Sequence, residues 1–229
     1  MSIPLPSRRL EPPALGRSAM EEQLRQGPAW LVGCDVSGVD LSGLDLTGWA
    51  FERCTMRTTR FKAARLHGTR WSGCRGAGAD FGSATLTEAE FRASDFNNAS
   101  FRRAALASAR FTGCKLTGAD LSEAGTLGTV FEETLLVAAR LPGISFRKAR
   151  LLRLDFAQAD LRKADFRDAV LDECSLRDAS LAGARFEGAD LRGADLGGLR
   201  LGDAALFKGA TISRQQAGQM LSELGLRVR

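Results

Sequence analysis

The sequence predicts an all-β solenoid in which the chain turns every five residues and closes one coil every 20. Large apolar residues recur in a single five-residue frame from Val36 to Leu206. Small residues recur two positions before them, and the cysteines are separated only by multiples of 20 residues. Neither the 3.6-residue period of a helix nor the two-residue period of a strand produces this pattern, so the internal repeat decides the fold.

The large apolar residues form the first column of the repeat. The frame has 35 positions, of which 30 are Leu or Phe, and it contains 12 of the 13 phenylalanines. The remaining five positions hold Val36, Met56, Trp71, Gly76 and Thr126. We expect this column to point inward and fill the axis of the coil.

The small residues form a second inward column, and the other three positions of each unit are mostly polar. A typical unit is Ala-Asp-Leu-Arg-Gly at 189–193. One large and one small side chain per unit would therefore face inward, while three face solvent. The Asp residues fall on an outward position of the frame, so we read them as surface groups rather than as catalytic carboxylates.

The cysteines test the coil length independently, because all five occupy the small column: Cys34, Cys54, Cys74, Cys114 and Cys174. Residues 20 apart should lie above one another, and the same rule stacks the aromatic residues Phe51, Trp71, Phe91, Phe111 and Phe131. A second ladder is Phe146, Phe166 and Phe186. We interpret the cysteines as small buried residues; a disulfide or metal site among the first three is the alternative. No cofactor is expected.

These units resemble the pentapeptide-repeat family, whose motif is a small residue, Asp or Asn, Leu or Phe, a polar residue and often Gly. The resemblance covers residues 34–208. It implies a right-handed quadrilateral β-helix with four units per coil, about nine coils in all, stacked about 4.8 Å apart like neighbouring strands. Short helices should cap both ends, because open strand edges promote aggregation.

The N-terminal region, residues 1–33, lies outside the frame. Ser18 to Glu21 matches a capping box, which predicts a helix over 19–26 that Gly27 stops. Leu24 and Trp30 could cover the first coil. We expect residues 1–17, rich in Pro and Arg, to be mobile.

The C-terminal region, residues 209–229, has a second capping box at Ser213–Gln216, followed by apolar residues at helical spacing. This helix either caps the last coil or joins two copies of the chain. The apolar residues favour a homodimer interface, for which the candidates are Met220, Leu221, Leu224 and Leu226.

The C-terminal region also indicates which subfamily of pentapeptide-repeat proteins the chain resembles most. Gln216-Ala217, Leu221, Glu223-Leu224-Gly225 and Val228 look like the C-terminal segment of the Qnr and MfpA pentapeptide proteins. That resemblance implies binding to DNA gyrase, protection of gyrase from quinolones, and a C-terminal helix that joins two molecules. The repeat never loses register from Val36 to Leu206, which favours MfpA over the loop-bearing Qnr proteins.

The charge of this chain differs from that of the Qnr and MfpA proteins, which are thought to imitate duplex DNA with an acidic surface. The net charge is +5. Acidic and basic residues interleave, which disfavours direct binding to nucleic acid as well.

No apolar run is long enough to span a membrane, and the start lacks an apolar secretory core, so we expect a cytoplasmic protein. With one histidine and no nucleophile or phosphate-binding motif, we expect no enzyme activity.

A partner-binding surface is expected near the weakest repeat, where Thr126 replaces the large residue and predicts a small bulge. Outward positions become apolar there, and acidic residues lie close to them in the sequence or in the repeat. The candidates are Leu127, Val130, Leu135, Val137, Leu152, Glu132, Glu133, Asp172 and Glu173. The alternative function is a structural or adaptor scaffold for a partner other than a topoisomerase.

Overall fold

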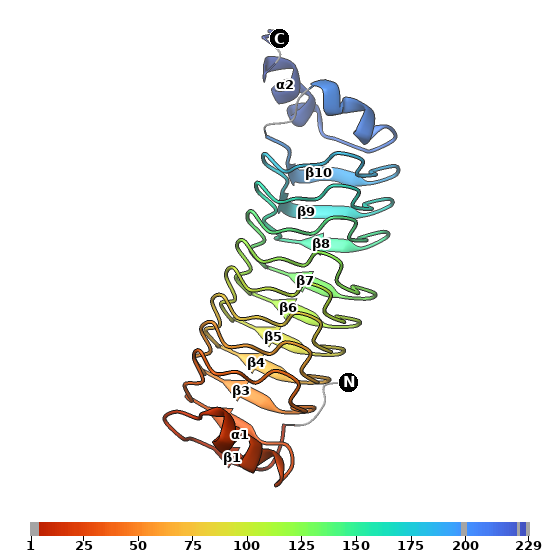
Figure 1. Cartoon of the computed structure of the whole chain (residues 1–229). Coiled ribbons are helices and arrows are strands. Elements are labelled where there is room, and N and C mark those ends of the chain that lie inside the picture. Colours follow the sequence, from red (N-terminus) through yellow and green to blue (C-terminus); the bar gives the residue numbers. More distant parts are fainter. Residues whose placement is uncertain (1–4, 198–200, 224, 228–229) are drawn as a thin grey trace. The chain divides into compact units, whose positions relative to one another are not determined.

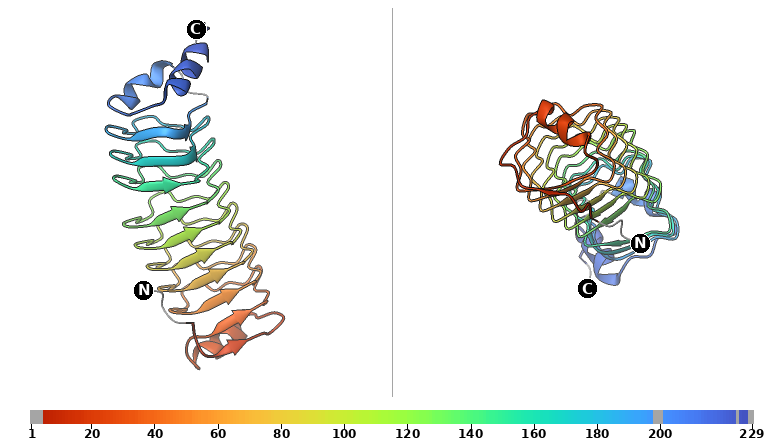
Figure 2. Two further views of the ribbon diagram at one scale, coloured as in Figure 1. Left: turned by 180° about the vertical axis from the view of Figure 1, so that it is seen from behind. Right: turned by 90° about the horizontal axis from the view of Figure 1, so that it is seen from below.

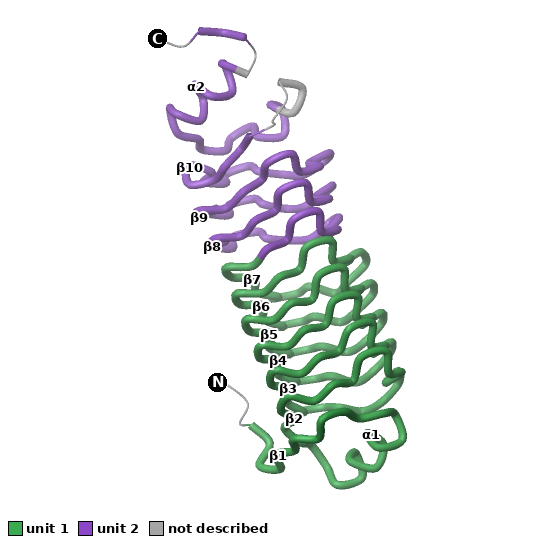
Figure 3. The backbone as a smooth tube through the Cα atoms, turned by 90° about the vertical axis from the view of Figure 1, so that its left-hand side faces the viewer, with its two compact units in different colours: residues 1–134 green, residues 135–229 purple. Residues whose placement is uncertain are grey.

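The structure, a computed structural model, describes residues 5–197, 201–223 and 225–227. It confirms a right-handed quadrilateral β-helix of about nine coils with short helices at its ends. Each coil takes 20 residues and has four faces of five residues each. The coils divide into two compact units, residues 1–134 and 135–229 (Figure 3), which are described separately below.

Unit 1 consists of parallel strands that pair in chain order, one from each coil (Figure 1). Each residue of β3 to β7 pairs with the residue 20 positions earlier, as the repeat predicts. We call the face that carries these strands the strand face. The elements of unit 1 are β1 (Arg9–Leu10), α1 (Arg17–Leu24), β2 (Trp30–Val32), β3 (Ala50–Glu52), β4 (Arg70–Ser72), β5 (Glu90–Arg92), β6 (Arg110–Thr112) and β7 (Val130–Glu132).

The corners between faces explain the polar positions of the repeat. In unit 1 the residue two places after the inward Leu or Phe has a left-handed backbone, whether it is a glycine such as Gly118 (φ 68°) or not, as at Arg53 (φ 52°). At many corners an Asp carboxylate accepts the N–H two residues on: Asp80 Oδ1 receives the Gly82 N–H at 2.8 Å. These Asp residues therefore form Asx turns, a structural role beyond that of solvated surface groups.

The aromatic residues of unit 1 stack along the axis as predicted. Ring centroids lie 4.2 Å apart for Phe51 and Trp71, 5.6 Å for Trp71 and Phe91, 4.6 Å for Phe91 and Phe111, and 5.1 Å for Phe111 and Phe131. All five side chains are buried. Rings from neighbouring faces meet them edge-on, which is a favourable geometry for aromatic pairs.

Gly76, an exception in the large column, is explained by its neighbour one coil on. A Cβ at Gly76 would collide with the ring of Phe96. That ring therefore occupies the space that a Leu side chain at position 76 would take, and the interior stays filled although the frame is interrupted.

The five cysteines are buried and carry free thiols. Their positions confirm the 20-residue coil, yet they do more than replace alanine. Cys54 Sγ lies 3.4 Å from the carbonyl oxygen of Leu31, and Cys74 Sγ lies 3.3 Å from that of Phe51. The thiols of Cys54 and Cys74 thus each donate a hydrogen bond to the preceding coil, as the hydroxyl of Ser94 does at the equivalent position.

Burial also makes two of these thiols poor nucleophiles. It raises the pKa of Cys34 to about 12 and that of Cys114 to about 11. Reactivity needs the thiolate, so Cys34 and Cys114 should be inert near neutral pH. Among the described residues, no group of three or more His, Cys, Asp or Glu side chains could hold a metal ion.

The ladder begins earlier than residue 34. Arg9 and Leu10 of β1 pair with Trp30 and Leu31 of β2, and Ala14 forms a bridge with Asp35. The expectation that residues 1–17 are mobile is therefore wrong for the described part of that segment. The sequence misleads because these pairs lie 21 residues apart, so the first partial coil is out of frame.

Helix α1 differs from its prediction at both ends. It begins at Arg17 after an extended Gly16, with no side-chain cap, so Ser18 lies inside the helix. The Leu15 N–H donates to the Asp35 carbonyl at 3.0 Å, which fixes the chain just before the helix and moves its start upstream. The fully buried residue of α1 is Met20, whereas Leu24 and Trp30 are half-buried. Figure 2 shows α1 and β1 beside the first coil of unit 1.

The coil around Thr126 keeps its register, so the predicted bulge is absent. Gly125 bridges to Ala105, and its carbonyl accepts the Leu106 N–H at 2.8 Å. The Leu127 carbonyl accepts the Ser108 N–H at 2.9 Å. Thr126 itself is half-buried, so a smaller inward side chain is accommodated without an inserted residue.

Unit 2 continues the same architecture with β8 (Arg150–Leu152), β9 (Val170–Ser175) and β10 (Asp190–Asp195). These strands are parallel and pair in order, with a register shift around Gly193 in β10. The predicted ladder is confirmed, with centroids 5.2 Å apart for Phe146 and Phe166 and 4.8 Å for Phe166 and Phe186.

The last repeats depart from the frame. Residues 201–207 form a 3-10 helix instead of coil faces; the sequence places Leu199 where the small column expects a small residue. Phe207, one residue out of frame, continues the ladder by stacking on Phe186 with centroids 4.6 Å apart. The chain then pairs with β10: Asp190 bridges to Thr211, and the Leu191 N–H donates to the Thr211 carbonyl at 2.9 Å. Helix α2 (Arg214–Glu223) follows.

Candidate interaction surfaces

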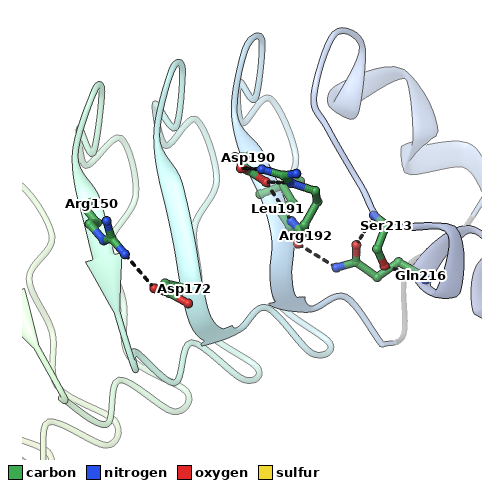
Figure 4. Close-up of polar contacts among 7 residues, drawn as sticks. All are labelled: Arg150, Asp172, Asp190, Leu191, Arg192, Ser213 and Gln216. Carbon is green, nitrogen blue, oxygen red and sulfur yellow. Dashed lines mark hydrogen bonds and ion pairs between the residues drawn. The ribbon is translucent and has the colours of Figure 1, made fainter.

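Helix α2 is attached to the last strand of unit 2 by one side chain. The predicted capping box is confirmed: the Gln216 N–H donates to Ser213 Oγ at 3.1 Å, and the Ser213 N–H donates to Gln216 Oε1 at 2.6 Å. The amide Nε2 of Gln216 also donates to the carbonyl of Leu191 at 2.6 Å (Figure 4). It donates to the carbonyl of Ala194 at 2.6 Å as well. Gln216 is buried, so it both starts the helix and covers the strand edge of β10.

The predicted dimer residues lie in the last turns of α2 and just beyond its end. Met220 is half-buried, while Leu221 is 40% exposed and Leu226 is 55% exposed. Gly225 (φ 78°) ends the helix, and the Leu226 N–H donates to the Leu221 carbonyl at 3.0 Å. This bond places Leu226 next to the last turn of α2. Leu224, the remaining predicted member, lies outside the described residues.

The strand face of unit 2 is lined by ion pairs. Arg192 donates two hydrogen bonds to the Asp190 carboxylate, from Nε to Oδ1 at 2.9 Å and from Nη2 to Oδ2 at 2.6 Å. Arg150 on β8 contacts Asp172 on β9 at 3.0 Å (Figure 4). The hydrogen bonds from Arg192 hold the pKa of Asp190 down at about 2. Asp172 and Asp190 are therefore neutralised by neighbouring guanidinium groups.

The Asp190 pKa gives a testable pH dependence. A carboxyl group whose pKa is lowered by folding adds stability above its unfolded pKa of about 3.9, and this stability is lost as the pH falls toward 2. Arg192→Gln is expected to return the Asp190 pKa toward its ordinary value. Carbon-detected NMR titration of the carboxyl group measures it. Arg162→Gln, which removes the partner of Asp160 instead, is the control; an unchanged Asp190 pKa in Arg192→Gln would contradict the assignment.

The predicted apolar partner residues do not gather on one face in either unit. In unit 1, Leu127 is 85% exposed at the corner after Thr126, and half-buried Val130 begins β7 on the strand face. In unit 2, Leu135 (40% exposed) and half-buried Val137 share a face, whereas Leu152 ends β8 on the strand face. They are separate apolar positions within each unit.

The predicted acidic residues are also dispersed. Glu132 and Glu133 are exposed at the end of β7, and Glu173 is exposed in β9. Asp172 is half-buried and paired with Arg150.

Sequence reasoning did not single out Gln216 as the attachment point of α2. Its place in the capping box was visible, but its contacts with β10 were not, because they join residues outside the five-residue frame.

No described helix is both long and apolar enough to cross a membrane.

Comparison with known proteins supports the same fold. The family model for pentapeptide repeats matches residues 59–92, 84–123, 129–168 and 159–198, with 8 copies of the repeat. No curated protein matches the sequence.

Three solved structures of QnrB1, described as a plasmid-mediated fluoroquinolone resistance protein, are similar to this chain. One trypsin-treated variant has a TM-score of 0.75 and 24% identity, covering 86% of this chain and 99% of QnrB1. A second has a TM-score of 0.72 and 25% identity over 88% and 98%. The full-length protein has a TM-score of 0.61 and 19% identity over 95% and 97%.

Proposed function

This chain belongs to the pentapeptide-repeat family, and we propose on that basis that it is a non-enzymatic binding protein which docks on DNA gyrase or a related type II topoisomerase. In this role it protects the enzyme from quinolone-type inhibitors in the cytoplasm. The observation that carries the proposal is the similarity to QnrB1, which extends over 86% of this chain and 99% of that one.

The fold suits a docking protein. Within each unit, neighbouring coils are joined by backbone hydrogen bonds, and the interior is filled with stacked side chains. The outward positions can then vary without changing the backbone that presents them. Little reordering is needed on binding, which reduces the entropic cost of association.

The charges of this chain favour a mixed polar contact over imitation of DNA phosphates. The net charge is +5, and on the strand face of unit 2 Asp172 and Asp190 are bound by Arg150 and Arg192. A partner that approaches this face meets alternating charges. Exposed apolar residues such as Leu127 and Leu135 would add local hydrophobic contacts.

A supercoiling assay with purified gyrase tests the proposed function. The expected result is that micromolar amounts of this protein restore supercoiling in the presence of a quinolone. Heat-denatured protein is the control. If the native protein neither alters supercoiling nor rescues it from the drug, gyrase protection is ruled out, and a scaffold for another partner becomes the better account of this chain.

The C-terminal helix is proposed to join two copies of the chain. Leu221 and Leu226 are exposed beside one another at the end of α2, and Met220 adds a half-buried neighbour. Leu221→Asp is expected to convert a dimer to a monomer, because it places a charge in an apolar contact. Light scattering measures the mass, with Gln219→Asp, an exposed position on the same helix, as control. A wild-type monomer at micromolar concentration would contradict the interface.

A further inference from the structure

A hollow of about 150 Å³ lies on the outer side of the strand face in unit 1. It exists because of one small residue. Trp30, Ala50 and Arg70 occupy the same outward position in β2, β3 and β4 and pair in register. The methyl group of Ala50 therefore lies between an indole and a long guanidinium side chain, and leaves a notch between them. We call it the Ala50 hollow; Leu5, Glu52, Glu90 and Arg92 also line it.

The walls of the Ala50 hollow are held in place. The guanidinium of Arg9 stacks over the Trp30 ring, 4.9 Å from its centroid, so the indole is covered on one side. Ala50 is almost fully buried, and the aromatic rings beneath it belong to the stacked core. A preformed, mostly apolar concavity is the usual setting for a small-ligand site.

Arg70 gives the hollow a donor that folding leaves unused. Its side chain is only 18% exposed, and its Nε lies 3.9 Å from Glu90 Oε2, a weak contact that Glu90 shares with Arg92 at 3.3 Å. The Nη2 atom of Arg70 is buried, and no described residue accepts a hydrogen bond from it. An unsatisfied buried donor is unfavourable, and a small rotation of the flexible Arg70 side chain would bring it to a ligand.

The charges around the hollow favour an anion. Arg70 and Arg92 share one carboxylate, that of Glu90, while Glu52 has its own partner in Arg53 at 3.3 Å. Counting Arg53, which lies beside the hollow but outside its lining, there are three guanidinium groups and two carboxylates. A cavity of about 150 Å³ with apolar walls accepts a group the size of benzene.

We propose that the Ala50 hollow binds a carboxylate carried on a benzene-sized apolar body. The apolar body packs over Ala50 against Trp30, displacing the exposed Leu5 side chain from the edge. The carboxylate accepts the hydrogen bond that Arg70 Nη2 lacks. Nothing in this proposal depends on gyrase binding, so the two can fail independently.

Calorimetric titration of the full-length protein with sodium benzoate tests this site. A ligand of this size should bind with a Kd in the millimolar range. Sodium acetate lacks the ring and benzyl alcohol lacks the charge, so both are expected to bind about tenfold more weakly or worse. No saturable heat with benzoate up to about 20 mM, roughly ten times the expected Kd, or equal affinity for benzoate and benzyl alcohol, overturns the proposal.

Two variants locate the site. Ala50→Leu fills the notch and should abolish benzoate binding, whereas Ala105→Leu, an exposed outward position on another face, should not. Arg70→Met keeps the apolar stem and should weaken benzoate about tenfold while leaving benzyl alcohol unchanged. Arg110→Met, in the same outward position two coils on, is its control. Circular dichroism confirms that each variant folds; a folded Ala50→Leu that binds benzoate like the wild type contradicts the assignment.

Discussion

Phe91→Ala is expected to lower the free energy of unfolding by about 3–5 kcal/mol, the largest effect of any single substitution considered for this chain. Phe91 is fully buried in unit 1. It stacks on Trp71 and Phe111, with centroids 5.6 and 4.6 Å away, and meets the edges of rings on the neighbouring faces. Alanine would leave a cavity that these rings cannot close, because each is held by its own coil.

Phe91→Leu is the matched control. Leucine is the commonest alternative in this column of the repeat and fills most of the same volume, so its cost should be smaller, about 1 kcal/mol. Urea unfolding followed by circular dichroism measures both. If alanine and leucine at this position cost the same, Phe91 does not fill the axis as described.

Gln216→Ala is expected to release α2 from the last strand of unit 2, at a cost of about 2–3 kcal/mol. Alanine removes the amide donor from the carbonyls of Leu191 and Ala194 and the acceptor from the Ser213 N–H. These groups lie at the buried end of the coil, where water does not readily replace the lost partner. Amide hydrogen exchange in α2 should accelerate accordingly.

Two further variants separate the roles of Gln216. Gln216→Glu keeps the acceptor for Ser213 but cannot donate to the two carbonyls when ionised, so it should destabilise α2 as alanine does. Gln215→Ala, at an exposed position one residue earlier, should leave the exchange rates unchanged. Protection of α2 that survives both Gln216 variants would show that the helix is held by other contacts.

The sequence predicts the coil because every coil repeats the same contacts. A column such as Cys54, Cys74 and Cys114 occupies one position of the coil, with Ser94 in the coil between the last two, so its spacing in multiples of 20 reports the coil length directly. The same repetition made the aromatic ladders predictable. Local signals were also reliable where they did not compete with tertiary contacts, as at the Ser213 capping box.

Prediction failed where the chain enters or leaves the repeat. Ser18 has the capping signature, yet the bond from Leu15 to Asp35 starts α1 earlier. Phe207 lies one residue out of frame and still joins the ladder, because the 3-10 helix before it shifts the register. The Ala50 hollow was equally hidden, since it depends on three residues that become neighbours only when the coils stack.

The central claim is that residues 20 apart lie one coil spacing apart, and pulsed electron resonance between two spin labels tests it most directly. The native thiols are buried, so labels attach at introduced cysteines. Asp45, Ala105 and Gly125 occupy one exposed column of unit 1. The pair Asp45→Cys with Gly125→Cys should give about 19 Å, about 4.8 Å more than Asp45→Cys with Ala105→Cys. Equal distances for the two pairs, or a broad distribution for either, would contradict the stacked coil.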